Sequence, residues 1–319
     1  MPKPLHNRDA FLRLIHELRL ADLEMLTAVL RQDGFGAYGI ERASESLFGQ
    51  GLIRRLWLHR DPKSRHDRGS RRKVFMLSPA GAARIGLSVD DAKNTETRWK
   101  TLSNPRTEYR LQHELMLARF HASLLLAQKH HPAMLRLGLW HQGEGTQMSA
   151  DSFRLTPDAR LQLVCDAFRR SGWFFLEADT GNERLESDDD SRRTIEQKVR
   201  RYGVIDRDAV AVDQFEIPGF SVLFLVPRRA SKDNVSGRER GVLATIQKAG
   251  MLKLHAPKFY RVLSETDVEA ALKNPNHYIE TRCLHVITPD GKVQATSFVP
   301  QPVHSTSQPD YTEIAELIA

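Results

Sequence analysis

The sequence Leu155-Thr-Pro-Asp-Ala159, followed by Trp173-Phe-Phe-Leu-Glu-Ala-Asp179, decides the fold expected for the central region. Each stretch predicts a short strand that carries a carboxylate at or near one end. Because side chains alternate along a strand, Glu177 and Asp179 are expected on the same side of the chain. Neighbouring strands can bring their ends together, so Asp158 is expected beside Glu177.

Helical and strand patterns alternate around these two stretches. The order is a helix, three strands, a helix and an apolar strand, at residues 108–129, 135–141, 152–164, 172–178, 191–202 and 220–226. Two of the strands are too apolar to face water, which favours an α/β fold with helices covering the sheet. Further helices at 236–250 and 265–272 and strands at 258–263 and 281–287 extend the sheet at one edge, and residues 291–319 are predicted to be a tail.

Carboxylates that meet beside a cation are typical of a divalent metal site that handles phosphate. The predicted metal ligands are Asp158, Glu177 and Glu114, and the metal expected is Mg or Mn. The predicted catalytic residues are Asp158, Glu177, Asp179 and Lys198, the lysine neutralising charge that develops on phosphorus. Metal-activated water would be the nucleophile.

Each of these residues also has a plainer interpretation. Asp158 after a proline can shape a turn, Asp179 can begin the turn that Gly181 completes, and Lys198 can be one cation of a solvated helix face. Together they favour a metal site, because Glu177 follows an apolar run and a carboxylate beside a buried strand needs compensation. Glu183 is a further candidate for the site.

The amino-terminal third predicts a winged helix-turn-helix domain over residues 1–88, followed by a linker at 89–104. Helices are expected at 8–18, 21–30 and 38–48, the last being the recognition helix, and strands at 52–59 and 73–77 form the wing. A recognition helix enters the major groove while a cationic hairpin contacts phosphates. The alternative is a solvated basic loop on an unrelated helical domain.

Positive charge is concentrated in the predicted wing. The chain has a net charge of +7, and nine basic residues but two acidic ones lie between Arg54 and Lys73. A basic patch of this kind favours nucleic acid as the partner. The predicted DNA-binding residues are Tyr38, Arg42, Arg54, Arg55, Lys63, Arg65, Arg68, Arg71, Arg72, Lys73 and, on the helix after the acidic strands, Tyr202.

Other classes of protein are disfavoured by the composition of the 319 residues. The apolar runs are too short to span a bilayer and the start lacks a signal-peptide core, which predicts a cytoplasmic protein without membrane insertion. The two cysteines form no CxxC pair, so neither a disulfide framework nor a zinc ribbon is expected. No His-x-His occurs, which disfavours nicking through a covalent tyrosine intermediate.

These residues in this order resemble the replication-relaxation family, whose core is similar to the PD-(D/E)XK nuclease fold and which includes a class of plasmid mobilisation relaxases. The matching stretches are 155–159, 174–183 and 198–202, with the winged helix upstream, and the resemblance covers roughly residues 8 to 230. It implies a restriction-endonuclease-like α/β domain of the PD-(D/E)XK nuclease type at 105–290, in which Asp158 and Glu177 are the metal-binding acids and Glu114 the acid of the first helix. Asp179 stands where the motif has lysine, and Lys198 replaces that lysine from the helix.

The resemblance implies a DNA-binding, metal-dependent endonuclease or relaxase that nicks or processes plasmid or mobile-element DNA. Its partner would be double-stranded DNA, at an origin of transfer or of replication, with a homodimer and other relaxosome proteins as further expectations. A catalytically inactive replication or transcription regulator is the alternative, which Asp179 favours. A nuclease of low specificity is a weaker third reading.

Overall fold

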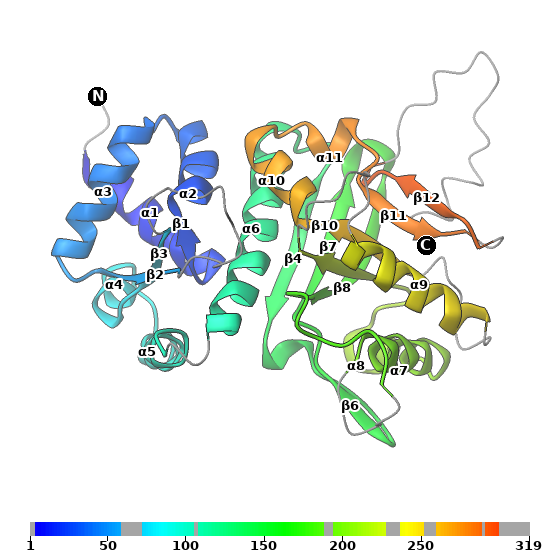
Figure 1. Ribbon diagram of the computed structural model, residues 1–319. Helices are drawn as coiled ribbons and strands as arrows, with labels where there is room; N and C mark the ends of the chain where they lie inside the picture. Colours follow the sequence, from blue (N-terminus) through cyan, green and yellow to red (C-terminus); the bar gives the residue numbers. More distant parts are fainter. Residues whose placement is uncertain are drawn as a thin grey trace, which may run out of the picture. The chain divides into compact units, whose positions relative to one another are not determined.

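The computed structural model describes residues 4–58, 72–104, 108–187, 194–227, 237–251, 260–288 and 291–299 (Figure 1). The chain forms two compact units, Met1–Leu126 and Ala127–Ala319. No helix in the described ranges combines the length and the apolar character that crossing a membrane requires.

The first unit contains the predicted winged helix. Its elements are α1 (Pro4–Leu18), β1 (Ala21–Asp22), α2 (Leu23–Leu30), α3 (Ala37–Gly49), β2 (Ile53–Trp57), β3 (Lys73–Leu77), α4 (Pro79–Arg84), α5 (Val89–Leu102) and most of α6 (Glu108–His130). The three strands form an antiparallel sheet in the order β1-β3-β2, so β2 and β3 are the wing and α3 is the helix before it. The cationic tip predicted for the wing, with Lys63, Arg65, Arg68 and Arg71, falls outside the described residues.

Two sequence-based boundaries in this unit differ from the structure. The helix expected from residue 21 begins at Leu23, because Ala21 and Asp22 pair with β3 and the Asp22 side chain caps α2 by accepting a bond from the Met25 amide. The predicted linker forms α5, which Ser88 begins with a capping box. Its polar composition reflects the exposed side of a helix.

A buried arginine joins α6 to the rest of the first unit. Arg119 and Asp22 are each 1% exposed, and the Arg119 Nη2 lies 3.2 Å from the Asp22 carboxylate. The same guanidinium also pairs with Glu24 on α2. The first unit therefore continues to Leu126, well past the boundary predicted at residue 104.

His121, two residues later on α6, makes the first unit sensitive to acid. Burial lowers the pKa of His121 from 6.5 to about 3, and its Nε2 is 4.0 Å from the Glu17 carboxylate, too far for a hydrogen bond. Between about pH 6.5 and pH 3, His121 is protonated in the unfolded chain but neutral in the folded chain. Stability contributed by the neutral ring is therefore lost as the pH falls through this window.

We expect the free energy of unfolding to fall by about 2 kcal/mol between pH 6.5 and 5 through this one group. Urea denaturation across this pH range measures the slope. A His121→Leu variant is expected to lose that part of the slope, whereas the exposed His130→Leu is expected to keep it. Equal slopes in wild type and His121→Leu would refute the assignment.

The second unit is built on a seven-stranded sheet in the order β12-β11-β10-β9-β8-β7-β4. The strands are β4 (Arg136–Gln142), β7 (Ala159–Cys165), β8 (Arg170–Ala178), β9 (Ser221–Val226), β10 (Tyr260–Ser264), β11 (Leu284–Ile287) and β12 (Val293–Thr296). β8, β9 and β10 are parallel and the remaining pairs are antiparallel. The predicted order of helix, three strands, helix and strand is present as α6, β4, β7, β8, α7 and β9, which confirms the predicted α/β fold class.

Two strand predictions need correction. The strand expected at 152–164 is divided into β6 (Phe153–Leu155), which pairs with β5 (Met148–Ala150), and β7. Pro157 lies between β6 and β7. Because proline has no backbone N–H, it cannot donate a hydrogen bond to a neighbouring strand. The predicted tail begins with β12, the edge strand of the sheet, and residues 300–319 lie outside the described part.

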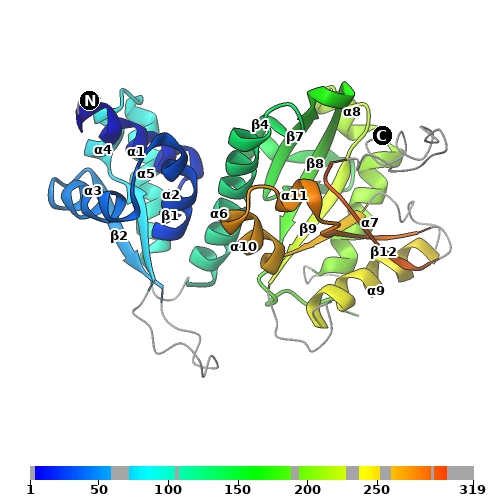
Figure 2. The same cartoon turned by 90° about the horizontal axis from the view of Figure 1, so that it is seen from above.

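Helices α7 (Ile195–Arg207), α8 (Val210–Phe215) and α9 (Gly237–Met251) lie on one face of this sheet, and α10 (Glu265–Lys273) and α11 (His277–Glu280) lie on the other (Figure 2). Apolar residues recur along α7 at Ile195, Val199, Tyr202 and Ile205, and they pack with Phe175 and other side chains of β8 and β9. Thr194 caps the helix by accepting a bond from the Gln197 amide. This packing fixes the side of α7 that faces the end of β8.

Candidate active site

Asp158 and Glu177 lie side by side at one end of the β7–β8 pair. The register pairs Ala159 with Leu176, and the Asp158 amide donates to the Leu176 carbonyl at 3.0 Å. The Asp158 Oδ2 in turn accepts a bond from the Ala178 amide at 2.7 Å. These bonds hold the Asp158 carboxylate against the end of β8, where Glu177 is located.

Glu177 is bound by two side chains of α7. It is 2% exposed, its Oε2 lies 2.9 Å from the Lys198 Nζ, and its Oε1 accepts a bond from the Tyr202 hydroxyl at 2.7 Å. Lys198 and Tyr202 are four residues apart and therefore project from one side of the helix. The predicted approach of Lys198 to the acidic strand ends is present in the structure.

Lys198 bridges two carboxylates, because its Nζ also lies 2.9 Å from the Glu183 Oε2. Burial alone would lower the pKa of Lys198, but Glu177, Asp158 and Glu183 raise it well above its ordinary value. The ammonium group is therefore charged at every physiological pH. Three carboxylates around one ammonium leave the cluster with an excess of negative charge.

The pKa of Glu177 is raised, with burial as the largest cause. The Lys198 charge opposes this shift, the Asp158 charge adds to it, and the bond from Tyr202 opposes it. Strongly shifted carboxylates in contact with a specific charge partner are concentrated at functional sites.

Asp179 is held apart from this cluster by an arginine. It is 2% exposed, its Oδ1 accepts a bond from the Gly181 amide at 2.8 Å, and its Oδ2 pairs with Arg238 on α9. The Arg238 Nη2 donates to the Glu183 carbonyl at 2.5 Å. Asp179 thus begins the turn at Gly181, as in the plainer interpretation of this residue. The Asp179–Arg238 pair orients the segment that carries Glu183.

Arg238 is the site residue that the sequence did not single out. It lies in a basic stretch, 228–240, whose sequence fits a second phosphate-contacting patch and a solvated loop equally well, and residues 228–236 are outside the described part. In the structure the Arg238 side chain is 9% exposed and forms an ion pair with Asp179. No local pattern links it to an acid fifty-nine positions earlier.

The prediction that Tyr202 contacts the DNA backbone is wrong. The Tyr202 side chain is 0% exposed and its hydroxyl is committed to Glu177. Its ring packs in the aromatic core against Phe175 and Phe220, with the Phe175 ring centroid 6.1 Å away. Tyr202 therefore acts as a support for Glu177.

Glu114 lies on α6 in the first unit. Burial lowers the pKa of Arg98 to about 10, and the Glu114 charge opposes that shift, which places the two side chains near each other. Its role as an outer metal ligand stays a prediction. In the described part of the chain, no group of three or more His, Cys, Asp and Glu side chains is arranged to hold a metal.

The described DNA-binding candidates fall into two groups. On α3, Tyr38 is 73% exposed and the Arg42 guanidinium lies 5.7 Å from the centre of its ring. The second group lies in the wing stem, which comprises β2, β3 and the adjoining Arg72. There Arg55 and Lys73 both pair with Glu45, at 3.0 and 2.9 Å.

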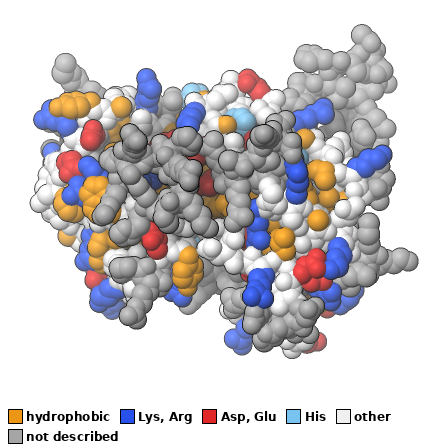
Figure 3. All heavy atoms as spheres, in the orientation of Figure 1, with side chains coloured by type: hydrophobic (Ala, Val, Ile, Leu, Met, Phe, Trp, Pro, Cys, Tyr) orange, Lys and Arg blue, Asp and Glu red, His pale blue; other side chains and the backbone are white. Residues whose placement is uncertain are grey.

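Arg54 and Arg72 are also close to acidic residues outside 54–73, the range over which the charge of the wing was counted. Arg54 lies 2.6 Å from Glu96 on α5, and Arg72 lies 3.7 Å from Asp22 and 3.8 Å from Glu24. Among the described residues on the face drawn in Figure 3, Lys and Arg side chains are interspersed with acidic and hydrophobic ones. The wing stem thus carries less excess charge than its sequence indicates.

Comparison with known proteins gives one family and two weakly similar structures. A family model described as replication-relaxation matches residues 12–212. Two structures of the restriction endonuclease FokI, one of them bound to DNA, share 13% identity with this chain, with TM-scores of 0.30 and 0.29. The alignments cover 85% of this chain but 44% of the FokI chains, so this chain spans less than half of their length. No curated protein matches the chain.

The family match covers more than half of the chain and contains both the winged helix and the cluster of Asp158, Glu177 and Lys198. The resemblance seen in the sequence is thereby confirmed. The chain belongs to the replication-relaxation family.

Proposed function

We propose that this protein binds DNA through its winged helix and cleaves one strand at the Asp158–Glu177–Lys198 cluster, as a relaxase-like nickase of plasmid or mobile-element DNA. The observation that carries the proposal is the meeting of these three side chains, which come from the start of β7, the end of β8 and the α7 helix. Cytoplasmic double-stranded DNA would be the substrate, at an origin of transfer or of replication.

The residues fit a divalent cation in part. Asp158 and Glu177 supply two carboxylates at one place, the excess negative charge suits Mg²⁺ or Mn²⁺, and Mg²⁺ is commonly bound through one or two carboxylates plus waters and substrate phosphate. A bound ion would supply an activated water and polarise the scissile phosphate. Lys198, which is buried and charged, would neutralise negative charge developing on that phosphate. Glu183 and Tyr202 hold Lys198 and Glu177 in position.

Incubation of supercoiled plasmid with the protein and Mg²⁺ or Mn²⁺ tests the proposal. We expect nicking that Asp158→Asn and Glu177→Gln each reduce by at least about a hundredfold, the scale seen when one transition-state contact is lost. Asp151→Asn, an exposed carboxylate on the same unit, is the matched control and is expected to nick like wild type. Unchanged nicking by Asp158→Asn would contradict the proposed site.

A second function is favoured by a specific observation. Both oxygens of Glu177 are already engaged, by Lys198 and Tyr202, and Asp179 is neutralised by Arg238. These contacts suit a protein that keeps the nuclease-like fold to bind DNA as a replication or transcription regulator. A gel mobility shift without nicking under any divalent metal, retained in Asp158→Asn, would identify this alternative.

A further inference from the structure

Arg160 of β7 lies on the same face of the sheet as the proposed active site. Side chains two residues apart on an extended chain share a face, so Arg160 follows Asp158 on that face, about 7 Å further along the chain. The register pairs Arg160 with Phe175 of β8, which belongs to the core under α7. Glu177 also faces α7, because it bonds to side chains of that helix.

The Arg160 guanidinium is held against an aromatic ring. Its central carbon lies 3.9 Å from the centre of the Phe215 ring, within the range of a cation–π interaction. Phe215 ends α8, and Gln214 ties that helix to β5 through two hydrogen bonds with the Ser149 backbone, at 2.9 and 3.1 Å. The Phe215 ring also packs against Phe175, with 6.4 Å between the ring centroids. The guanidinium is therefore oriented before any ligand binds.

Arg160 is a partly buried cation without an acidic partner among the described residues. Its Nε is buried and has no hydrogen-bond partner there. Burial lowers the pKa of Arg160, and no neighbouring charge contributes to that shift. By contrast, Lys198, Arg238 and Arg119 each pair with a carboxylate. Because an arginine stays charged at neutral pH, the desolvation of Arg160 is uncompensated unless an anionic ligand binds to it.

Such a ligand has access to Arg160 from the edge of the sheet. β4 is the edge strand beside β7, and the register pairs Arg160 with His141 of β4. The His141 side chain is exposed, and Arg160 is itself half-buried. An anion can therefore approach the guanidinium across β4.

We propose that Arg160 binds a phosphate of the DNA strand a few nucleotides from the scissile phosphate, and thereby holds that strand at Asp158 and Glu177. The inference rests on the proposed function, since it names how the strand to be cleaved is held. A guanidinium presents forked donors that match phosphate oxygens. Nucleotides follow one another at roughly 3.4 Å along each strand of a duplex, so the spacing between Asp158 and Arg160 corresponds to a few nucleotides.

Binding of a short labelled DNA duplex to the full-length protein, measured by fluorescence anisotropy without divalent metal, tests the inference independently of cleavage. Each neutralised phosphate contributes about 0.9 to the slope of log K against log salt concentration. Arg160→Met is expected to weaken binding about tenfold and to reduce this slope by about 0.9. A slope equal to that of wild type would overturn the inference.

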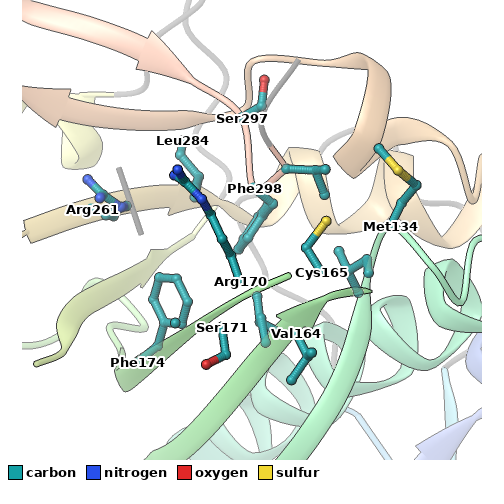
Figure 4. A pocket seen from close by; sticks show the side chains of 14 residues that line it. Met134, Val164, Cys165, Arg170, Ser171, Phe174, Arg261, Leu284, Ser297 and Phe298 are labelled. Atoms are coloured by element: carbon teal, nitrogen blue, oxygen red, sulfur yellow. The ribbon is translucent and has the colours of Figure 1, made fainter. Parts of the chain in front are cut away.

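Arg170→Met is the matched control, because it removes one positive charge from the neighbouring strand β8. The Arg170 Nη1 is likewise buried without a partner among the described residues, but Arg170 lines a pocket on the other face of the sheet. Figure 4 shows Arg170 and Cys165 on one side of these strands and Ser171, which shares the face of Phe175, on the other. Arg170→Met is expected to keep the wild-type slope.

A purely structural role for Arg160 predicts a different pattern. Methionine keeps an apolar side chain on Phe215 and removes a desolvated charge, so we expect Arg160→Met to leave the urea midpoint unchanged or to raise it. Arg160→Lys keeps the charge but not the fork, and is expected to retain most of the salt slope while binding more weakly than wild type. A lowered urea midpoint together with an unchanged salt slope would assign Arg160 to the core and refute the contact with DNA.

Nicking of supercoiled plasmid with Mg²⁺ separates this inference from the proposed function. Arg160→Met is expected to need about tenfold more plasmid for half-maximal nicking while keeping most of the maximal rate, because the phosphate it contacts does not react. A wild-type protein that shows the Arg160-dependent slope but never nicks would refute the proposed cleavage and retain the contact. Nicking by wild type with identical slopes for wild type and Arg160→Met would do the reverse.

Discussion

Lys198→Met is expected to lower the free energy of unfolding of the second unit by roughly 3–5 kcal/mol, the range for a buried ion pair that loses one partner. Lys198 is the counter-ion of Glu177, whose side chain is 2% exposed. Its removal leaves a carboxylate in the interior with only the Tyr202 hydroxyl as a close partner. The exposed pair Lys248–Glu186, at 2.6 Å, provides the matched control. Lys248→Met is expected to cost less than about 1 kcal/mol.

The pH dependence of this variant follows from Glu177. Without Lys198 its pKa rises further above the ordinary value of 4.5, so the folded variant holds a proton that the unfolded chain has released. Stability is then present below pH 4.5 and lost as the pH rises toward the raised pKa. Urea denaturation should show the gap between variant and wild type widening from pH 5 to pH 8. A gap that is constant or narrows over this range would show that Glu177 is not the uncompensated group.

Arg119→Ala is expected to destabilise the first unit by a similar amount, roughly 3–5 kcal/mol. The variant removes the closer of the two cations beside Asp22, which is 1% exposed and keeps Arg72 at 3.7 Å. It also removes the ion pair that joins α6 to the winged helix. Arg119→Lys keeps the charge but loses the forked donors that reach both Asp22 and Glu24, so we expect an intermediate loss. Thermal and urea denaturation measure both effects.

The control for Arg119 is the exposed pair of Arg84 and Asp9 at 3.4 Å in the same unit. Arg84→Ala is expected to change the free energy of unfolding by less than about 1 kcal/mol. A loss equal to that of Arg119→Ala would mean that net charge, and not the buried contact, sets the stability of this unit.

The regular elements could be predicted because their signals are local. The apolar spacing of α1 and α3, the glycine break between α2 and α3, and the apolar run of β9 each depend on residues a few positions apart. Gly34 in that break has a φ of 87°, a left-handed conformation that glycine adopts without strain. Composition misled where an exposed helix resembled a linker, as in α5.

The candidate site was predictable in part for the same reason. Register follows from alternation, so Asp158 and Glu177 at adjacent strand ends could be placed together from their positions alone. The charge count of the wing left out Glu45, Glu96 and Asp22, which come from other elements and pair with Lys73, Arg54 and Arg72. A count along the chain cannot include partners that only folding brings near.

By itself, the amino-acid sequence determined most of the helices and strands, the family, and the two strand ends that carry the acids. Only the tertiary structure decided what each charged group contacts. Lys198 bridges Glu177 and Glu183, and the buried Tyr202 donates to Glu177. Arg238 forms an ion pair with Asp179, which is therefore not part of the Lys198 cluster. The reason is physical. Secondary structure arises from backbone preferences and apolar spacing over a few residues, whereas ion pairs and burial depend on side chains that are distant in the chain and meet when the sheet and its helices pack.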